Sequence, residues 1–403
     1  MTMDKALADL TVLDLSRVLA GPYGTMILGD FGADIIKVEQ PGRGDDTRQW
    51  GPPFSPHGQS AYFLSVNRNK RSVTLNLKSE EGREILRQLA SQADVLIENF
   101  KVGTMERLGL GYETLRASNP GLIYCSITGY GQTGPYKDRP GYDTVIQAQG
   151  GLMSITGPTG DGPDAEPFKV GVAIVDVSAG LFAVIAILAA LHHRERTGQG
   201  QQIDIALYDA QLGWLANVAS NYLVSGAPPQ RYGNAHGTIV PYQTFATADG
   251  HLMLAVGNDG QFRAFCGVLG LPALADDPRF ATNPGRVQHR NALLPRLEAI
   301  FRQRSTQEWI ERLLDVDVPC GPVSDVPTAL ADPQAQARQM VQRIVDSAGD
   351  EIALVGPVIK MSGTPAAIRS APPYLGEQSA EILGEKLQFG PEKIDELRQK
   401  EVI

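Results

Sequence analysis

The first 130 residues alternate between short apolar runs and segments with helical periodicity. The apolar runs have the length of buried strands and occupy 11–16, 34–40, 72–77, 94–99 and 122–128. Between two of them, Ser79 followed by Glu80 and Glu81 is a favourable helix start, because carboxylates in a first turn face the positive end of the helix dipole. This alternation predicts βαβ units on a parallel sheet, that is, a Rossmann-like α/β domain.

The longest apolar run, Val177–Leu191, contains no charged residue. It is shorter than the ~20 residues that a membrane-spanning helix needs, so we interpret it as a buried helix. Asp176 precedes it and has the position of a favoured N-cap, although burial among apolar neighbours would raise its pKa. A partly accessible, ionised Asp176 could also act as a nucleophile. Asp143 precedes another apolar run and could cap a helix in the same way.

The second half of the chain has a different composition. Residues 225–237 and 317–334 are rich in Gly, Pro, Asn or Asp, which predicts two linkers. Between them we expect a β-hairpin that turns at Asp249–Gly250 and a helix that opens with a capping box at Ser305–Glu308. The predicted division is the N-terminal part of a large domain at 1–200, a linker helix at 201–225, a small α+β domain at 226–325, and a linker with a C-terminal return to the large domain at 326–403.

Composition narrows the class of protein. The net charge of −9 disfavours binding to nucleic acid or to an anionic membrane, because both surfaces repel an acidic protein. Cys125, Cys266 and Cys320 are too few and too far apart for a disulfide framework or a CxxC metal site. The N-terminal residues lack the pattern of a signal or transit peptide. We therefore expect a cytoplasmic protein that binds no metal.

The loop after the first apolar run does not have a dinucleotide fingerprint. It contains Gly21 and Gly24 but no G-x-G-x-x-G, and Pro22 removes an N–H that could face a pyrophosphate, which argues against NAD or FAD. Basic residues nevertheless gather near the predicted strand ends, where open α/β sheets bind ligands and arginine can hold phosphate. A phosphate-bearing ligand and a solvated surface rim are both compatible with this set, which comprises Arg68, Lys70, Arg71, Lys78, Lys101 and Arg107.

Several segments together resemble the family III CoA-transferases, the group that includes formyl-CoA and carnitine CoA-transferases. They read LDLSRVLAGPYGTMILGDFGADIIKVEQPG, NRNKRSVTLNLK, DVLIENFKVGTMERLGLGYE, CSITGYGQTGPY and VDVSAGLFAVIAILAAL. The similarity covers most of the chain. The segment GNAHGTIVPYQTF looks most like the succinate, hydroxymethylglutarate and glutarate CoA-transferases.

The resemblance implies a role for Asp176 as the nucleophile that attacks an acyl-CoA thioester. The course it implies runs through an aspartyl anhydride and an aspartyl-CoA thioester before CoA passes to an acceptor acid. Coenzyme A is then a substrate, and no permanently bound cofactor is expected. By the same resemblance the large domain binds CoA, through Leu19, Ala20, Leu75, Lys78, Asn99, Phe100, Lys101, Met105, Arg107 and Tyr142.

The resemblance also implies an interlocked homodimer that acts on acyl-CoA and small carboxylic acids. A dicarboxylic acyl group is expected, with Arg17 or Arg48 available for its distal carboxylate. Both arginines could instead serve salt bridges or CoA phosphates. His236, in the Gly-rich linker, is either a substrate contact or an ordinary loop histidine, since it has no metal-ligand partner at a useful spacing.

Two other functions remain open from the sequence. The α-methylacyl-CoA racemases share the scaffold but use a His in a GHD segment, where this chain has GYD with Tyr142. A phenol with a pKa near 10 is a poor general base at neutral pH, so racemase is the lesser interpretation. The other alternative is a noncatalytic acyl-CoA-binding protein.

Overall fold

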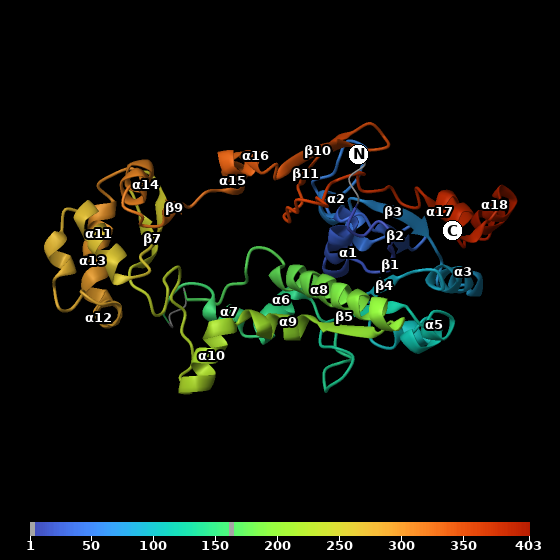
Figure 1. Cartoon of the computed structure of the whole chain (residues 1–403), viewed down its shortest axis with the longest axis horizontal. Helices are drawn as coiled ribbons and strands as arrows, with labels where there is room; N and C mark the ends of the chain where they lie inside the picture. Colours follow the sequence, from blue (N-terminus) through green and yellow to red (C-terminus); the bar gives the residue numbers. More distant parts are fainter. Residues whose placement is uncertain (1–4, 161–164) are drawn as a thin grey trace. The chain divides into compact units, whose positions relative to one another are not determined.

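The computed structural model describes residues 5–160 and 165–403, which belong to two compact units (Figure 1). The first unit combines Met1–Leu152, Lys169–Gly226 and Pro333–Ile403, and the second combines Met153–Phe168 with Ala227–Asp332. The C-terminal stretch therefore shares a unit with the N-terminal half of the chain. Each unit has its own hydrophobic core.

A six-stranded parallel sheet forms the centre of the first unit, which confirms the predicted α/β architecture. Its strand order is β3-β2-β1-β4-β5-β6, and Val12 of the central strand β1 pairs with Ile35 of β2 and Val95 of β4. The strands are β1 (Thr11–Asp14), β2 (Asp34–Glu39), β3 (Lys70–Thr74), β4 (Val95–Glu98), β5 (Ile123–Thr128) and β6 (Gln202–Ala206).

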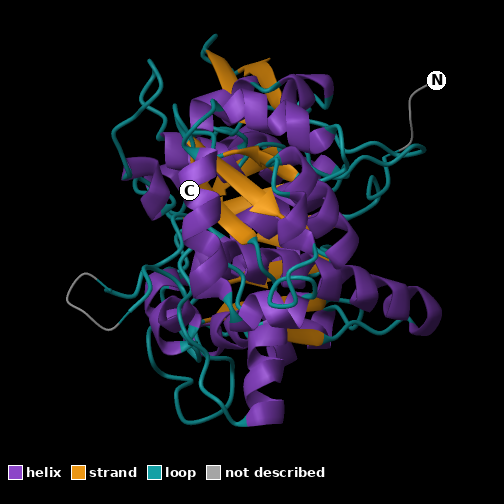
Figure 2. Cartoon of the chain, turned by 90° about the vertical axis from the view of Figure 1, so that its left-hand side faces the viewer, coloured by secondary structure: helices purple, strands orange, loops and turns teal. Residues whose placement is uncertain are grey.

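Helices cover both faces of this sheet (Figure 2). Because successive strand residues point to opposite faces, Val12 and Ile97 pack under α1, α6, α8 and α9, whereas Leu13 and Leu96 pack under α3, α5, α17 and α18. These helices are α1 (Ala20–Asp30), α3 (Glu80–Ala90), α5 (Tyr112–Ser118), α6 (Asp143–Gln149), α8 (Ile174–Thr197), α9 (Leu207–Trp214), α17 (Ser379–Leu387) and α18 (Pro391–Gln399).

The helix α8 lies closely against α1. A side chain at Gly180 would place its Cβ 2.5 Å from the Ala20 carbonyl oxygen, so only glycine allows this approach. Among the described residues, α8 alone is long and apolar enough to cross a membrane, a test that the core helix of a soluble protein also passes. Here Ile187 and Leu191 are buried in the core of the first unit, whereas Leu181 and Ile185 are exposed, so the predicted burial is confirmed for one face of the helix only.

Smaller elements complete the first unit. The strands β10 and β11 form an antiparallel pair whose Ile352 and Leu354 pack on Leu64. The predicted start of α3 is confirmed, since the Ser79 hydroxyl accepts the Gly82 N–H. The remaining elements are the 3-10 helix Asp46–Gln49, α2 (Ala61–Val66), α4 (Thr104–Arg107), α10 (Ala216–Ser225), α16 (Pro333–Ala337), β10 (Val341–Val345) and β11 (Glu351–Val355), with α7 (Leu152–Ile155) at a unit boundary.

The second unit packs helices on a three-stranded antiparallel sheet of order β7-β8-β9. The hairpin with its turn at Asp249–Gly250 and the capping box of Ser305 and Glu308 are both confirmed. Phe245, Phe301 and Trp309 centre its core. Its elements are β7 (Tyr242–Ala246), β8 (His251–Ala255), β9 (Cys320–Pro322), α11 (Asp259–Val268), the 3-10 helix Pro272–Ala275, α12 (Asn283–Gln288), α13 (Arg290–Phe301), α14 (Thr306–Leu314) and α15 (Val326–Ala331).

The segment expected to be a linker helix, 201–225, differs from the prediction. It opens with the edge strand β6, in which half-buried Ile203 and Ile205 alternate with exposed Gln202 and Asp204. A period of two suits a strand with one face toward the core and the other toward solvent, and β6 pairs with β5. Two helices, α9 and α10, then follow.

Candidate active site

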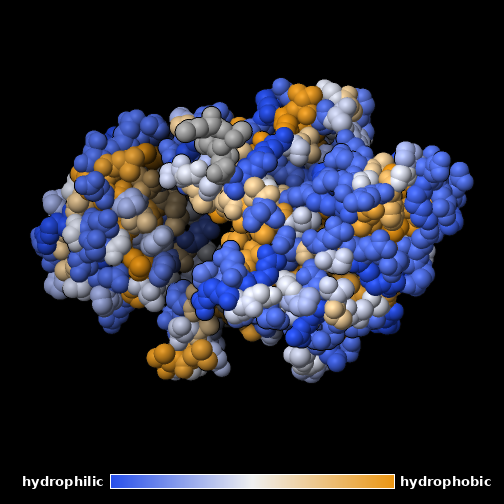
Figure 3. Space-filling view, turned by 45° about the vertical axis from the view of Figure 1, so that its right-hand side comes forward, coloured by the Kyte–Doolittle hydropathy of each residue, from blue (hydrophilic) through white to orange (hydrophobic). Residues whose placement is uncertain are grey.

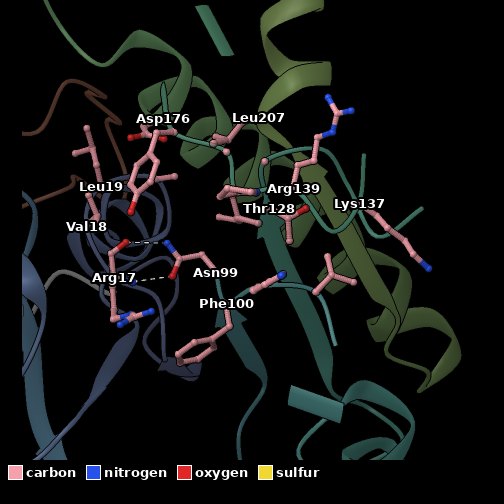
Figure 4. A pocket seen from close by; sticks show the side chains of 18 of the residues that line it. Arg17, Val18, Leu19, Asn99, Phe100, Thr128, Lys137, Arg139, Asp176 and Leu207 are labelled. Atoms are coloured by element: carbon pink, nitrogen blue, oxygen red, sulfur yellow. Dashed lines mark hydrogen bonds between the residues drawn. The ribbon is translucent and has the colours of Figure 1, made fainter. Parts of the chain in front are cut away.

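Two cavities open at the carboxyl-terminal edge of the parallel sheet. The strand order reverses direction between β1 and β4, so the loops that follow these strands diverge and leave a crevice between them. The first cavity, about 260 Å³, lies at this point (Figure 4). Its walls are Arg17–Ala20 after β1, Asn99–Val102 after β4, Ile127–Gly129 at the end of β5, Lys137 and Arg139–Tyr142 in the following loop, and Asp46, Asp176 and Leu207.

The loop after β1 has a strained backbone. Val18 has a φ of 71°, in the left-handed region, a conformation that costs a β-branched residue about 1–3 kcal/mol. The Val18 N–H donates to both carboxylate oxygens of Asp45, at 3.2 and 3.3 Å. Asn99 joins this loop to the loop after β4, because it accepts the Arg17 N–H at 2.9 Å and donates to the Arg17 carbonyl at 2.8 Å (Figure 4). These bonds hold two walls of the first cavity together.

Asp176 reaches the first cavity from the first turn of α8. The helix begins at Ile174, two residues before Asp176, so the expectation that Asp176 is the N-cap is wrong. The cap comes from another helix. Asp143 Oδ2 accepts the N–H of Val175 at 2.8 Å and that of Asp176 at 3.2 Å. The Asp176 side chain is therefore not committed to capping.

Asp143 is buried at the first position of α6 and caps α8 rather than its own helix. Gln147, one turn later, fixes the orientation of the Asp143 carboxylate by donating to its Oδ1 at 2.6 Å. The same glutamine accepts the Val170 N–H at 2.9 Å, which anchors the segment that leads into α8. The start of α8 is thus held from two sides.

Burial and the neighbouring charge of Asp143 raise the pKa of Asp176 to about 7. Among residues 5–160 and 165–403, no Lys, Arg or His forms an ion pair with the Asp176 carboxylate. A pKa near neutrality leaves a substantial ionised fraction, and that ionised carboxylate is poorly hydrated. Such a group can act as a nucleophile or as an acid and base at physiological pH.

A second cavity, about 170 Å³, lies beside the first. Leu75 and Lys78 line it, and Arg17 and Phe100 border both cavities. Of the residues predicted to bind CoA, eight line one cavity or the other, namely Leu19, Ala20, Leu75, Lys78, Asn99, Phe100, Lys101 and Tyr142.

The two other residues predicted to bind CoA line neither cavity. Met105 is buried in the core that also contains Leu15 and Leu75, so its contribution is packing beneath the loop after β4. Arg107 donates to the Thr104 hydroxyl at 2.9 Å on the short helix α4.

Half of the predicted basic set has a structural role instead of facing a ligand. Arg68 donates twice to the buried carboxylate of Asp30, and Lys70 is fully enclosed with its ammonium 2.9 Å from Asp14. Arg71 pairs with Asp34 and with two glutamates of α17. Strand-end position in the sequence could not distinguish these cations from free ones, because their acidic partners are distant in the chain.

The structure gives different environments to the residues that were proposed to contact the substrate. Arg48 donates to both oxygens of Glu39, at 2.8 and 2.7 Å, and to the Pro373 carbonyl, so its donors are occupied. Arg17 is 3.7 Å from Asp46, with a half-exposed side chain, and borders both cavities. His236 belongs to the second unit, where its ring stacks on Tyr242 and accepts the Thr238 N–H.

Sequence reasoning missed several residues that shape the first cavity. Lys137 and Arg139 line it from the loop after β5, and Arg139 stacks on the Tyr136 ring. Their only signal was a tight turn of Gly and Pro with two cations in it. Asp45, which holds Val18, was not among the residues selected from the sequence. In the described part of the chain, no three His, Cys, Asp or Glu side chains are grouped closely enough to hold a metal ion.

The fold and the site together define an α/β protein with a carboxylate of raised pKa in a cation-bordered crevice at the switch point of a parallel sheet. The family model for CoA-transferase family III matches residues 7–379. The chain therefore belongs to CoA-transferase family III and is an enzyme of that family.

Similar proteins cover almost the whole chain. The succinate–glutarate CoA-transferase of Agrobacterium fabrum is 48% identical over 94% of this chain and 95% of its own length. The succinyl-CoA:glutarate CoA-transferase of Mus musculus is 44% identical over 99% of this chain and 90% of its own length. The crystal structure of a CaiB/BaiF family protein from Brucella suis has a TM-score of 0.84 and 48% identity, and covers 95% of this chain and 100% of that chain.

Proposed function

We propose that this enzyme moves CoA from succinyl-CoA, or another dicarboxylyl-CoA, to a carboxylic acid, with Asp176 as the nucleophile. One observation carries the assignment: Asp176 reaches the first cavity without a cation partner among the described residues, and its pKa is raised to about 7 by burial and by Asp143. A carboxylate nucleophile also suits the chemistry, because it keeps the acyl group activated, whereas attack by water would hydrolyse the thioester.

The proposed reaction has four substitutions at carbonyl carbon. The Asp176 carboxylate attacks the thioester carbonyl, the C–S bond breaks, and CoA thiolate leaves an aspartyl anhydride. The thiolate attacks the Asp176 carbonyl carbon, which releases the donor acid and forms an aspartyl-CoA thioester. The acceptor carboxylate then attacks that carbon and expels the thiolate with formation of a second anhydride. Attack of the thiolate on the acceptor acyl carbon gives the product and restores Asp176.

The cations around the two cavities would receive the charged parts of CoA. Lys78 borders the second cavity, Lys101 and Lys137 border the first, and Arg17 borders both. Lysine and arginine side chains bind phosphate through charge-assisted hydrogen bonds. In this arrangement the phosphates lie across the strand ends and the thioester reaches Asp176.

The dicarboxylic substrate class is supported by the names of the relatives, which act on succinate and glutarate or their CoA thioesters. A distal carboxylate needs a cation with free donors. Arg17 meets that requirement and Arg48 does not, since Glu39 and the Pro373 carbonyl occupy its donors. We therefore assign Arg17 to the distal carboxylate or to a CoA phosphate.

The nucleophile can be trapped directly. The protein would be incubated with succinyl-CoA and quenched with hydroxylamine or borohydride, and peptides would be mapped by mass spectrometry. We expect modification at Asp176 only when succinyl-CoA is present, and none at Asp143, which serves as the internal control. Turnover with no modification at Asp176 would contradict the assignment.

A matrix of CoA donors against carboxylic acceptors then defines the reaction. The proposed function expects CoA transfer that depends on the acceptor acid and is fastest with dicarboxylic pairs. A racemase would instead exchange the α-proton of an acyl-CoA with deuterated solvent in the absence of any acceptor. A noncatalytic binding protein would retain CoA and turn over no pair.

We also propose that the enzyme is a homodimer. The face of α8 opposite the sheet exposes Leu181, Phe182, Ile185 and Leu188, and the end of α10 exposes Leu223 and Val224 at 80% and 89%. An apolar patch is visible at the lower edge of Figure 3, where Figure 1 places α10. Exposed apolar surface of this kind is typical of a protein interface. Sedimentation equilibrium should give twice the chain mass, and Ile185→Glu should lower it.

A further inference from the structure

Asp45 is a buried carboxylate in the loop after β2, and it joins the cavity wall to the interior of the sheet. The residue is 1% exposed. One of its carboxylate oxygens accepts the Lys37 ammonium at 3.0 Å, and the same ammonium donates to the Ser16 carbonyl at 3.0 Å. Asp45 also accepts the Val18 N–H. The Lys37–Asp45 pair therefore holds the backbone on both sides of Arg17.

The orientation of the Asp45 carboxylate is itself fixed. Its Oδ1 accepts the Thr47 N–H at 3.0 Å and the Thr47 hydroxyl at 2.8 Å, and its own N–H donates to Glu39 at 2.9 Å. These contacts leave the carboxylate with one arrangement in which it can meet Val18. If the Lys37–Asp45 pair only stabilised the fold, it would not need to hold the Val18 backbone in a strained conformation.

The strain at Val18 shows what this anchoring achieves. A valine rarely adopts a φ of 71°, and it would relax to an extended or helical conformation if its N–H were released. Relaxation would move Arg17 and Leu19, which line the first cavity on either side of Val18. The cavity wall is therefore in a conformation that its hydrogen bond to the buried Asp45 imposes.

We propose that Asp45 is a positioning residue, which through the Val18 N–H holds the Arg17–Ala20 wall in the shape that receives the acyl-CoA. This inference rests on the proposed function, because it concerns the same cavity. Asp45 also lines the second cavity, but its bond to the Val18 N–H is the contact by which we propose that it acts on the Arg17–Ala20 wall. This role predicts that loss of Asp45 changes the conformation of the loop at residues 17–20, which a purely stabilising role does not predict.

The test combines Asp45→Asn with a change that removes the need for anchoring. Glycine adopts positive φ without a penalty, so Val18→Gly should make the loop independent of Asp45. We expect Asp45→Asn to raise KM for the acyl-CoA by about tenfold when it is the only substitution, and by less than about twofold when it is added to Val18→Gly. Hydrogen exchange of peptides that cover residues 15–20 should accelerate in Asp45→Asn alone.

Asp30→Asn is the matched control. Asp30 is also a buried, ion-paired carboxylate, but it lies at the other end of α1 and lines neither cavity. Its substitution should lower the melting temperature and leave KM unchanged. If Asp45→Asn does not fold, Thr47→Val removes one hydrogen bond to Asp45 and keeps the charge. It should raise KM by about threefold.

The outcomes separate the two proposals. An Asp45→Asn effect that is equal with and without Val18→Gly, or a lower melting temperature with unchanged KM and exchange, would overturn the positioning role. If the unmodified enzyme transfers no CoA with any pair, the proposed function fails. The exchange measurement still decides in that case whether Asp45 holds the loop.

Discussion

Two groups of carboxylates lie near the ends of the parallel strands, and they have opposite electrostatic environments. In the charged cluster, which we define as Asp14, Lys37, Asp45 and Lys70, each acid has a lysine within 3.0 Å. In the α8 pair, Asp143 and Asp176, the described residues supply no cation. The same residue type is thus used in two ways a short distance apart in one unit.

The pKa directions follow from this difference. Burial alone would raise the pKa of Asp14, but Lys70, Lys37 and the hydroxyls of Ser16 and Thr25 lower it overall. Burial likewise opposes the ionisation of Asp45, whose pKa Lys37 and Thr47 lower to about 2. At Asp176 burial and Asp143 act together, and the pKa rises to about 7. Paired carboxylates support the structure, whereas Asp176, which has neither a counter-ion nor a capping role among the described residues, is the candidate for chemistry.

The largest effect is expected from Asp176→Asn. The amide cannot attack a thioester, so kcat should fall by roughly 10³-fold or more for every donor and acceptor pair. CoA binding, measured by calorimetry, should persist because the cavity walls are unchanged. A variant that transferred CoA at the native rate would refute the proposed mechanism.

The same variant sharpens the comparison through stability. A carboxylate whose folded-state pKa exceeds its unfolded value of about 3.8 binds more protons when folded, so it destabilises the protein as pH rises from about 4 to above 7. Asp176→Asn removes this penalty. At pH 8 its melting temperature should therefore exceed that of the unmodified enzyme, and at pH 4 the two should converge.

The charged cluster should respond in the opposite way. Asp14→Asn leaves the enclosed Lys70 without its carboxylate, and breaking a buried pair in this manner costs about 3–5 kcal/mol of unfolding free energy. Urea denaturation at pH 7 would measure the loss. The control is Asp395→Asn, which breaks an exposed pair with Arg398 and should cost less than about 1 kcal/mol. Equal losses in the two variants would remove the distinction between the groups.

The sequence predicted the parts of the molecule that depend on local pattern. The strands β1 to β5 of the large sheet, the start of α3 at Ser79 and the turn at Asp249–Gly250 all have signals within a few residues. Asp176 could also be found from the sequence, because a single acid beside fifteen uncharged residues is conspicuous. Its role came from the family resemblance rather than from its position.

Contacts between distant segments could not be predicted in this way. Arg48 looks free in the sequence and is occupied by Glu39 and Pro373, the second of which lies 325 residues away. Asp143 looks like the cap of its own helix and instead caps α8, more than thirty residues later. Local pattern fixes which polar groups are present, and the tertiary fold decides which of them are satisfied.

A moderate effect is expected from pH. If the ionised Asp176 is the nucleophile, kcat/KM should fall as pH drops through about 7, with roughly a tenfold loss from pH 8 to pH 6. Carboxylates that begin to protonate only near pH 4 would give no change in this range. A profile that is flat from pH 5 to pH 8 would therefore show that the pKa of Asp176 lies well below 7.

The smallest effect is expected from Asp143→Asn, which tests one component of the α8 pair. The amide oxygen can still accept the Val175 N–H, so the cap persists, while the negative charge beside Asp176 is lost. Burial remains the larger cause of the raised pKa, so the midpoint of the kcat/KM profile should move to lower pH by less than about one unit. Asp209→Asn, an exposed acid on α9, is the matched control and should leave the midpoint in place. A midpoint that does not move in Asp143→Asn would mean that burial alone raises the pKa of Asp176. A shift of the midpoint to higher pH would mean that Asp143 stabilises the ionised form of Asp176 through the start of α8.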